Sequence, residues 1–233
     1  MCGRSSLTKT EKELEERFNA TFYSDDLERY NPLPNFNVAP TQMHPVITNL
    51  YTEHLQFYRW GLIPFWAKDH KIGYKMINAR KETILEKSTF KNAMKKKRCI
   101  VPFDGFYEWR KVNGEKYPYR IKVNTEEIFT IAGLWERWSP PEGGDDVYTF
   151  TLITQEPNAF MKGIHDRMPA ILSREQESIW LDQDVPPEDL VQMLQPPPDE
   201  IMEAYTVPKR VGNVRNNDEG LIEAFDYQDL PPL

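Results

Sequence analysis

Short apolar segments separated by turn residues occur along most of the chain, and their lengths are those of strands. Either strict alternation with polar residues or a brief continuous apolar run marks each segment. The pattern predicts strands over residues 45–51, 55–60, 99–109, 117–123, 128–135, 147–154 and 202–207. Asn113-Gly114 is a strong signal for a tight hairpin between two of them. The step at Asp104-Gly105 breaks the segment at 99–109.

Helical spacing occurs in four other places. Thr8 to Glu11 form a capping box that predicts a helix to about Asn19, with Leu14 and Phe18 facing inward. The other helices are predicted over residues 79–97, 173–181 and from 186 or 187 to about 194. The segments that lack either spacing are predicted to be irregular loops, and they cover residues 24–44, 61–73 and 140–146.

Several strands joined by short turns, with helices around them, indicate an α+β fold. We expect a single domain over residues 2–233, with a largely antiparallel sheet or open β-barrel flanked by helices. The acidic part, residues 174–233, is expected to pack as part of this domain. A hydrophobic content of 39% and a charged content of 28% favour a folded chain over a disordered one.

Composition excludes several classes of protein. No apolar run approaches the length of a membrane span, and the N-terminus lacks the apolar core of a signal peptide. Two cysteines and four scattered histidines give neither a disulfide framework nor metal-ligand spacing, so we expect no metal and no cofactor. These features favour a cytoplasmic protein in a reducing compartment, with no membrane partner.

Charge is distributed unevenly along the chain. The net charge is −7, yet residues 59–110 hold 13 Lys and Arg against 5 Asp and Glu, a local balance of +8. Residues 174–233 hold 4 basic and 14 acidic side chains. A basic middle on an acidic body fits one face that binds a polyanion. The alternative is that residues 91–98 are only the solvated end of a helix, where cations suit the dipole.

The second residue carries unusual chemistry. Removal of Met1 before the small Cys2 would leave an α-amine beside a thiol, with reference pKa values of about 7.7–8.0 and about 8.5. The amine can form a Schiff base with an aldehyde, and the thiol can then close a five-membered thiazolidine. The alternative is that Cys2 is only a small apolar residue at a disordered terminus.

Five segments place polar residues where a packed core would not favour them. They are Met1-Cys2-Gly3-Arg4 and residues 59–67, 77–83, 98–109 and 163–169. In order and spacing they resemble the SOS-response-associated peptidase (SRAP) family, and residues 207–213 resemble its closing segment. The resemblance implies a protein that senses abasic sites in single-stranded DNA and crosslinks to them through Cys2. It places such a protein at the bacterial nucleoid when bound to DNA.

Three further residues are candidates for the chemistry. Glu108, between two aromatic residues at the end of an apolar strand, could transfer protons during imine formation; otherwise it is an ordinary edge-strand carboxylate. His165 could assist sugar ring opening or β-elimination, or could be a hydrogen-bonded structural residue. Asn78 could orient the Cys2 amine or a sugar hydroxyl, or could be a helix N-cap before Ala79.

A second group of residues is expected to bind DNA. Arginine pairs bidentately with phosphate, and exposed aromatic rings stack on bases. The candidates are Arg4, Arg80, Arg167, Trp66, Phe65 and, as a wall near the N-terminus, Pro40. Any of the arginines could instead form a salt bridge to Asp104 or Asp166. Trp60 and Cys99 are expected to be core residues.

Three functions remain open from the sequence. The first is the abasic-site crosslinking protein, whose Schiff base would also permit abasic-site lyase activity. The second is a thiol autopeptidase, with Cys2 as nucleophile and His165 as base, that removes its own N-terminus. The third is a DNA-binding module without chemistry. The partner is expected to be single-stranded DNA with abasic sites, and a monomer is the default state.

Overall fold

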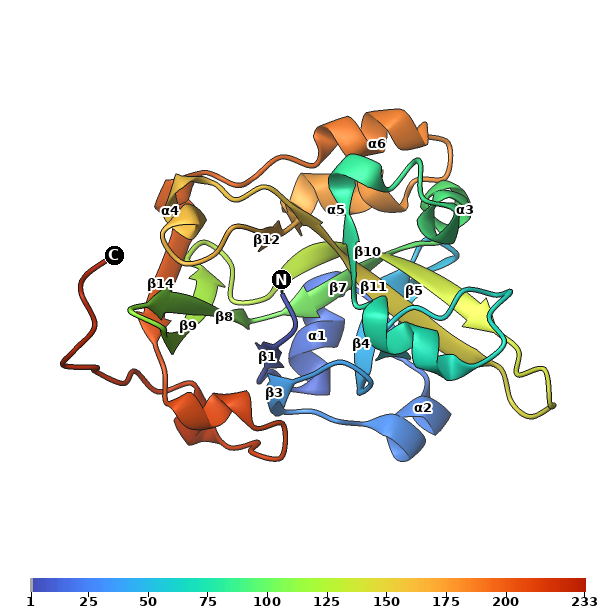
Figure 1. Cartoon of the computed structure of the whole chain (residues 1–233). Coiled ribbons are helices and arrows are strands. Elements are labelled where there is room, and N and C mark those ends of the chain that lie inside the picture. The colour runs from blue at the N-terminus through green and yellow to red at the C-terminus, as the bar shows by residue number, and fades with distance from the viewer. Residues whose placement is uncertain (1) are drawn as a thin grey trace.

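Five strands close into a barrel at the centre of the molecule. The computed structural model describes residues 2–233 (Figure 1). Strands pair in the order β11 (Val147–Gln155), β10 (Phe129–Trp138), β7 (Arg98–Phe103), β4 (Met43–Thr48) and β5 (Tyr51–Trp60). The ring closes because β5 also pairs with β11, in parallel, through Arg59 opposite Thr149. Short strands extend it: β2 (Thr21–Phe22), β6 (Asn78–Arg80), β12 (Met168–Pro169) and β13 (Ile171–Leu172).

A second, antiparallel sheet leaves the barrel where β7 breaks at Asp104. Its strand order is β14 (Met202–Thr206), β9 (Glu115–Val123), β8 (Gly105–Val112), β1 (Ser5–Leu7) and β3 (Asn35–Val38). The predicted hairpin joins β8 to β9, and Asn113 and Gly114 both have the positive φ that a tight turn needs, 50° and 88°. The α+β class with a mostly antiparallel, barrel-forming sheet is therefore confirmed.

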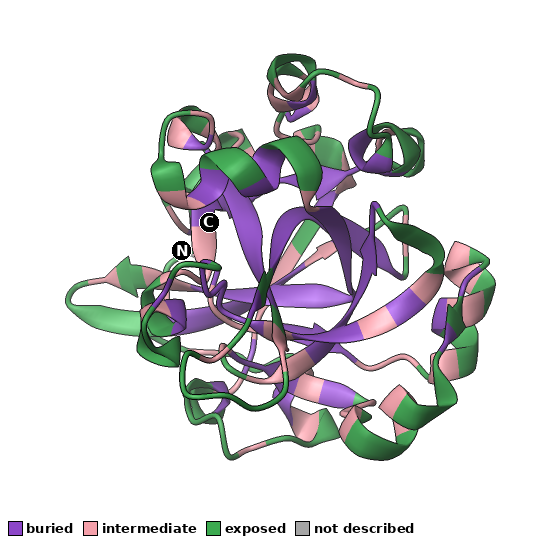
Figure 2. Cartoon of the chain, turned by 90° about the vertical axis from the view of Figure 1, so that its right-hand side faces the viewer, coloured by how far each residue is buried: buried purple, intermediate pink, exposed green. Residues whose placement is uncertain are grey.

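The core divides between the inside of the barrel and the layer under the helices. Trp60, Phe103 and Phe150 fill the barrel with fully buried rings, and the Cys2 side chain belongs to the same apolar cluster. A second cluster lies between the barrel wall and the surrounding helices. Figure 2 shows the buried strands enclosed by helices with exposed outer faces. Each of these large side chains contributes about 1.5–3 kcal/mol by leaving water.

Helices cover the barrel on two sides. In Figure 1, α3, α5 and α6 gather at the top and α1 and α2 at the bottom. The α-helices are α1 (Glu11–Phe18), α2 (Ser24–Tyr30), α3 (Ser88–Lys96), α4 (Ala159–Lys162), α5 (Arg174–Leu181) and α6 (Pro187–Met193). Short 3₁₀ helices occur at η1 (His70–Lys75), η2 (Lys81–Thr83), η3 (Asp199–Ile201), η4 (Lys209–Gly212) and η5 (Glu219–Leu221). No helix among residues 2–233 is both long enough and apolar enough to cross a bilayer.

Most predicted elements are confirmed, but the first capping box was assigned to the wrong residues. The cap is Thr10, whose side chain accepts from the Glu13 N–H while Glu13 bonds back to Thr10. Thr8 cannot cap because its N–H and its hydroxyl both donate to Asp104. The second predicted box, Ser173 with Gln176, is confirmed.

Two other predictions are wrong in part. Residues 24–44 are not all loop. They include α2, which is favoured by two aspartates in its first turn, and β3, which forms because it pairs with β1. Residues 79–97 are not one helix. Residues 78–80 form β6, which pairs with β11; the 3₁₀ helix η2 follows, and the α-helix α3 begins only at Ser88.

Candidate active site at the N-terminus

The N-terminal segment reaches Glu108 because it runs antiparallel beside β8. Ser5 lies opposite Phe106, and the Tyr107 N–H donates to the Arg4 carbonyl over 2.8 Å. Continuing this register brings Cys2 and Gly3 alongside Glu108. The pairing of the short strand β1 with β8 therefore places Cys2 close to the Glu108 carboxylate.

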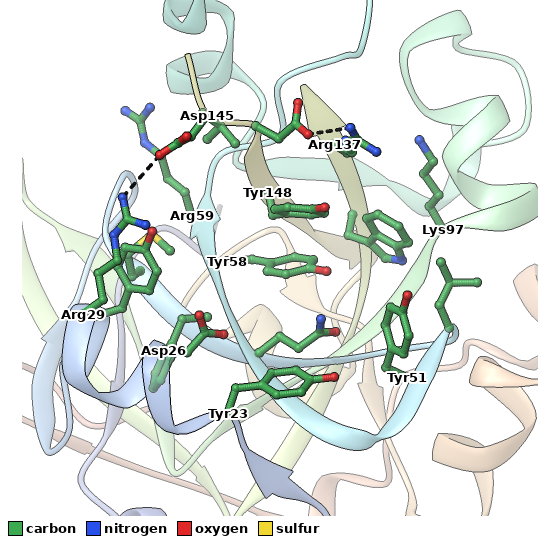
Figure 3. A pocket seen from close by; sticks show the side chains of 18 residues that line it. Tyr23, Asp26, Arg29, Tyr51, Tyr58, Arg59, Lys97, Arg137, Asp145 and Tyr148 are labelled. Atoms are coloured by element: carbon green, nitrogen blue, oxygen red, sulfur yellow. Dashed lines mark ion pairs between the residues drawn. The ribbon is translucent and has the colours of Figure 1, made fainter. Parts of the chain in front are cut away.

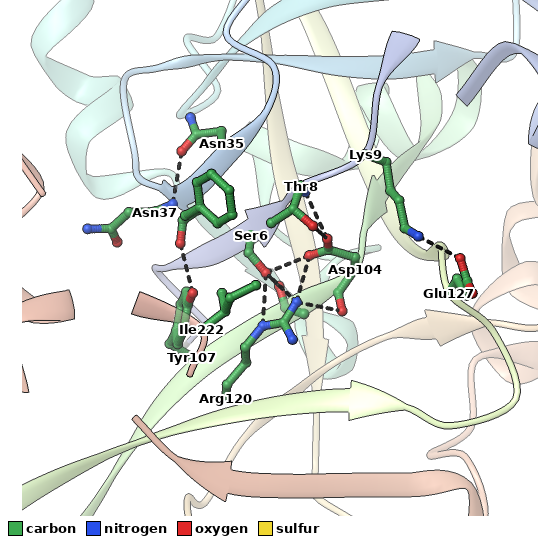
Figure 4. A network of polar contacts seen from close by, with 12 residues as sticks. Ser6, Thr8, Lys9, Asn35, Asn37, Asp104, Tyr107, Arg120, Glu127 and Ile222 are labelled. Atoms are coloured by element: carbon green, nitrogen blue, oxygen red, sulfur yellow. Dashed lines mark hydrogen bonds and ion pairs between the residues drawn. The ribbon is translucent and has the colours of Figure 1, made fainter. Parts of the chain in front are cut away.

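A buried polar network fixes β1 in this position (Figure 4). The Ser6 hydroxyl donates to Asp104 over 2.6 Å, and the Thr8 N–H donates to the other oxygen of Asp104 over 2.8 Å. Arg120 on β9 forms an ion pair with Asp104 at 3.0 Å and also bonds to Ser6. The Tyr107 hydroxyl donates to the Phe36 carbonyl on β3. Both charges of the ion pair are buried and fully hydrogen-bonded, so they specify one register for β1.

Asn78 holds the backbone of Cys2. Its side-chain amide donates to the Cys2 carbonyl over 2.9 Å. Asn78 begins β6, opposite Leu152 of β11, so the alternative that it is a helix N-cap is wrong. Its Oδ1 is buried and has no hydrogen-bond partner among residues 2–233. That oxygen is therefore available to accept a hydrogen bond from a substrate hydroxyl or an amine.

Burial shifts the pKa values of both Cys2 and Glu108. The Cys2 thiol is fully buried, and this burial together with the nearby Glu108 charge raises its pKa to about 12. Burial also raises the pKa of Glu108, although a positive charge on His165 acts in the opposite direction. The thiol is consequently protonated near neutral pH, and Glu108 is the adjacent group suited to proton transfer. Met1, whose removal the sequence predicts, lies outside the described residues.

His165 faces Glu108 with a defined ring nitrogen. Its Nε2 lies 3.7 Å from a Glu108 oxygen, while its Nδ1 accepts the Arg167 N–H over 3.0 Å. The neutral ring therefore carries its proton on Nε2, toward Glu108. The exposed Asp166 carboxylate also lies 2.9 Å from Nδ1 and can accept a hydrogen bond whenever that nitrogen carries a proton.

Two of the three predicted phosphate clamps already have partners. The Arg4 guanidinium donates to Asn37 over 2.9 Å and to the backbone carbonyls of Val211 and Gly212. Arg167 forms a bidentate pair with Glu82 at 2.8 and 2.9 Å, so neither arginine uses the Asp104 or Asp166 expected as alternatives.

Arg80 differs from these two arginines. It is exposed on β6, two residues beyond Asn78, and no hydrogen bond or ion pair engages its side chain among residues 2–233. Its guanidinium is therefore available to an anion that approaches the Asn78 side of the site.

The aromatic candidates separate as predicted into surface and core. Phe65 and Trp66 are 58% and 52% exposed, on the loop after β5. Trp60 is fully buried, and its indole N–H donates to the Ile77 carbonyl, which positions the residue before Asn78. Pro40 is half-buried, in the turn between β3 and β4. Cys99 is a buried core thiol, as expected.

A basic groove contains the catalytic candidates Glu108 and His165; the sequence predicted a basic face but did not identify the residues of this groove. The groove is open to solvent, and Glu108 and His165 are among its lining residues. Its other charged lining residues are four cations, Arg110, Lys111, Lys116 and Lys162, and two exposed carboxylates, Glu156 and Asp166. The first two follow Glu108 on β8, which is the signal that could have identified them, but Lys162 comes from α4 and only the fold brings it close.

Another cavity lies at a separate place on the barrel (Figure 3). The rings of Tyr58 and Tyr148 stack there with their centroids 5.2 Å apart. Arg29 and Arg137 on its rim pair with Asp145 and Asp146. None of the predicted catalytic or DNA-binding residues lines this cavity. Among residues 2–233 no three His, Cys, Asp or Glu side chains are grouped as metal ligands would be.

Comparison with known proteins identifies the family of this chain. The family model described as SOS response associated peptidase (SRAP) matches residues 1–214. The chain belongs to the SRAP family. A SRAP relative named abasic site processing protein YoqW, from Bacillus subtilis (strain 168), is 45% identical over 96% of this chain and 100% of its own length. The abasic site processing protein HMCES of Xenopus tropicalis is 34% identical over 93% of this chain and 76% of its own.

Solved structures show the same SRAP fold. A crystal structure of a protein from Bacteroides thetaiotaomicron superposes with a TM-score of 0.89 at 31% identity, covering 96% of this chain and 100% of that one. A second, from Bordetella bronchiseptica, has a TM-score of 0.75 at 25% identity, over 89% of this chain and 100% of that one. The SRAP model ends at residue 214, so the last part of this chain lies beyond it.

Proposed function

We propose that this SRAP protein binds single-stranded DNA at an abasic site and forms a covalent thiazolidine through Cys2. The observation that carries the proposal is the convergence on Cys2 of Asn78, which bonds its carbonyl, and Glu108, whose charge acts on its thiol. The names of YoqW and HMCES as abasic site processing proteins support abasic DNA as the substrate.

The reaction begins at the amine that removal of Met1 would expose on Cys2. In its neutral form the amine attacks the aldehyde carbon of the open sugar and forms a C–N bond. Glu108 can accept the proton that the nitrogen loses and return it to the carbinolamine hydroxyl, which leaves as water. The thiol then adds to the imine carbon, and its proton passes to the nitrogen. The balance is an aldehyde and an aminothiol giving a thiazolidine and one water.

Glu108 suits both steps because its raised pKa makes it a stronger base than an exposed carboxylate. The thiol, with a pKa of about 12, needs a base beside it at the moment of ring closure. His165 Nε2 lies 3.7 Å from a Glu108 oxygen, and the ring can assist opening of the closed sugar.

The same imine would permit a lyase reaction. If the thiol does not close the ring, a base can remove a proton from the sugar carbon next to the imine. The electron pair forms a double bond and expels the 3′ phosphate, which cleaves the strand. His165 is the candidate base, since its exposed edge lies at the groove.

The test is a denaturing gel of mature protein mixed with an abasic oligonucleotide. Wild type should give a stable crosslink. Cys2→Ala keeps the amine but cannot close the ring, so it should give only a borohydride-trappable imine. Acetylation of the amine should abolish both products. Equally stable crosslinks from Cys2→Ala would rule out the thiazolidine.

Self-processing is a second candidate, favoured by the closeness of a buried thiol to Glu108 and by the family's description as a peptidase. In that case Cys2 would attack the peptide bond before it. Mass spectrometry of Cys2→Ala, Glu108→Gln and His165→Ala distinguishes the two proposals. An N-terminus that is processed equally in all three variants excludes self-cleavage and leaves the crosslinking proposal standing.

A further inference from the structure

The end of the chain lies across the rim of the basic groove. In Figure 1 the C-terminal segment passes the tip of the β8–β9 hairpin toward α4. Arg110 donates to the carbonyl of Pro231 over 2.6 Å and to that of Pro232 over 3.0 Å. A methyl group of Leu233 lies against Gly163, 3.5 Å from where a Cβ would be. Gly163 and Arg110 both line the groove that contains Glu108 and His165.

Two parts of this segment are held differently. Residues 225–230, which we name the anchor, pack Tyr227 and Leu230 against the core cluster of the barrel. The Tyr117 hydroxyl also donates to Asp229 over 2.6 Å. Residues 231–233, which we name the latch, are exposed, and their hydrogen bonds are the two to Arg110. The latch can therefore leave the groove while the anchor stays in place.

The charges around the latch favour an anionic competitor. Lys111, Lys116 and Lys162 are exposed and have no ion-pair partner among residues 2–233. Arg110 is bonded by two neutral carbonyls, which leave its charge uncompensated. A phosphate would give the same guanidinium a bidentate, charge-assisted bond, which is stronger than a bond to a neutral carbonyl.

We propose that the latch, residues 231–233, competes with the phosphate backbone of bound DNA for Arg110, so that DNA entering the groove displaces it. The inference rests on the proposed function, since it makes the groove the track of the strand that flanks the abasic site. It adds an intramolecular competitor that lowers affinity for every strand, damaged or intact. The latch has no charged side chain, so it competes for the hydrogen bonds of Arg110 and leaves the charge-assisted bond to the phosphate.

The experiment compares the full chain with a variant that ends at Leu230, using fluorescence anisotropy with an intact single-stranded oligonucleotide. The intact strand cannot crosslink, so this affinity does not depend on Cys2 chemistry. Loss of two hydrogen bonds that DNA must otherwise displace should tighten binding about three- to tenfold. The variant should unfold at the same temperature as the full chain, because the latch is exposed.

Arg110→Ala and Lys111→Ala provide the matched controls. Both should weaken binding, but only Arg110→Ala should abolish the gain from removing the latch. Unchanged affinity on removal of the latch, or a gain that persists in Arg110→Ala, would overturn the inference. Crosslinking of an abasic strand by the shortened chain would still support the proposed function. If the shortened chain binds the intact strand more tightly but forms no crosslink with an abasic strand, the proposed function is wrong and the proposal about the latch still holds.

Discussion

At the scale of single residues, the site combines groups whose ordinary properties burial has changed. Cys2 is a thiol that stays protonated, and Glu108 is a carboxylate with a raised pKa beside it. A buried carboxylate that prefers its neutral form costs stability once it ionises. Its folded pKa lies above the unfolded one, so its favourable contribution is complete at low pH and is lost as pH rises through the folded value. The protein keeps this destabilising carboxylate at position 108, where the proposed chemistry needs a base.

Glu108→Gln tests this interpretation with three measurements. The crosslinking rate should fall about 10²-fold or more, because proton transfer is lost. The melting temperature should fall less than in wild type as pH rises through the Glu108 pKa, because Gln does not ionise. The Cys2 thiol should react with a small alkylating reagent at lower pH than in wild type, since the Glu108 charge that raises its pKa is gone. A variant that crosslinks at the wild-type rate would show that Glu108 is not the proton-transfer group.

The sequence identified the residues that gather around Cys2, but it did not identify the ion-pair partners of the arginines. Glu108, His165 and Asn78 were selected by residue type and position. In the fold, Asn78 and Glu108 lie beside Cys2, and His165 lies beside Glu108. The Glu82 partner of Arg167 was not anticipated, because 85 residues separate them. Whether Arg4, Arg80, Arg167, Phe65, Trp66 and Pro40 contact DNA stays a prediction.

At the scale of elements, the critical strand is the shortest in its sheet. β1 has three residues and little apolar pattern, so periodicity could not reveal it. It is specified by Ser6 and Thr8, which bond to Asp104, which in turn pairs with Arg120. The hairpin at Asn113 and the cap at Ser173 were predictable, since their signals are local.

Asp104→Ala should therefore cost stability and crosslinking together. It leaves the buried Arg120 charge without its partner, which typically costs about 3–5 kcal/mol. Urea unfolding followed by tryptophan fluorescence measures the loss. Asp218→Ala breaks an exposed ion pair with Arg210 and is the control, expected to cost no more than about 1 kcal/mol. Similar losses from both variants would refute the role given to the network.

At the scale of the whole molecule, the net charge is −7, yet four cations line the groove that contains Glu108 and His165. The local excess in residues 59–110 pointed to such a face, but Lys116 and Lys162 join it only through the fold. Each free cation that binds a phosphate should contribute to the salt dependence of binding.

Single replacements of Lys111, Lys116 and Lys162 with alanine should make DNA binding less sensitive to salt. The slope of log affinity against log salt concentration should become shallower by about 0.7 for each phosphate of a single strand that the lysine neutralises in wild type. Titrations of an intact oligonucleotide at several salt concentrations give this slope. Lys12→Ala, an exposed lysine on α1 that does not line the groove, is the control. Slopes that change equally in the groove variants and in Lys12→Ala would show that DNA does not follow the groove.

The most direct measurement is the mass of the first peptide after mature protein reacts with abasic DNA and the DNA is digested. The account predicts a peptide that starts at Cys2 and carries the sugar remnant less one water. It should resist borohydride, because the ring contains no imine. A remnant found on another residue, or a crosslinked peptide that still begins with Met1, would contradict the central claim.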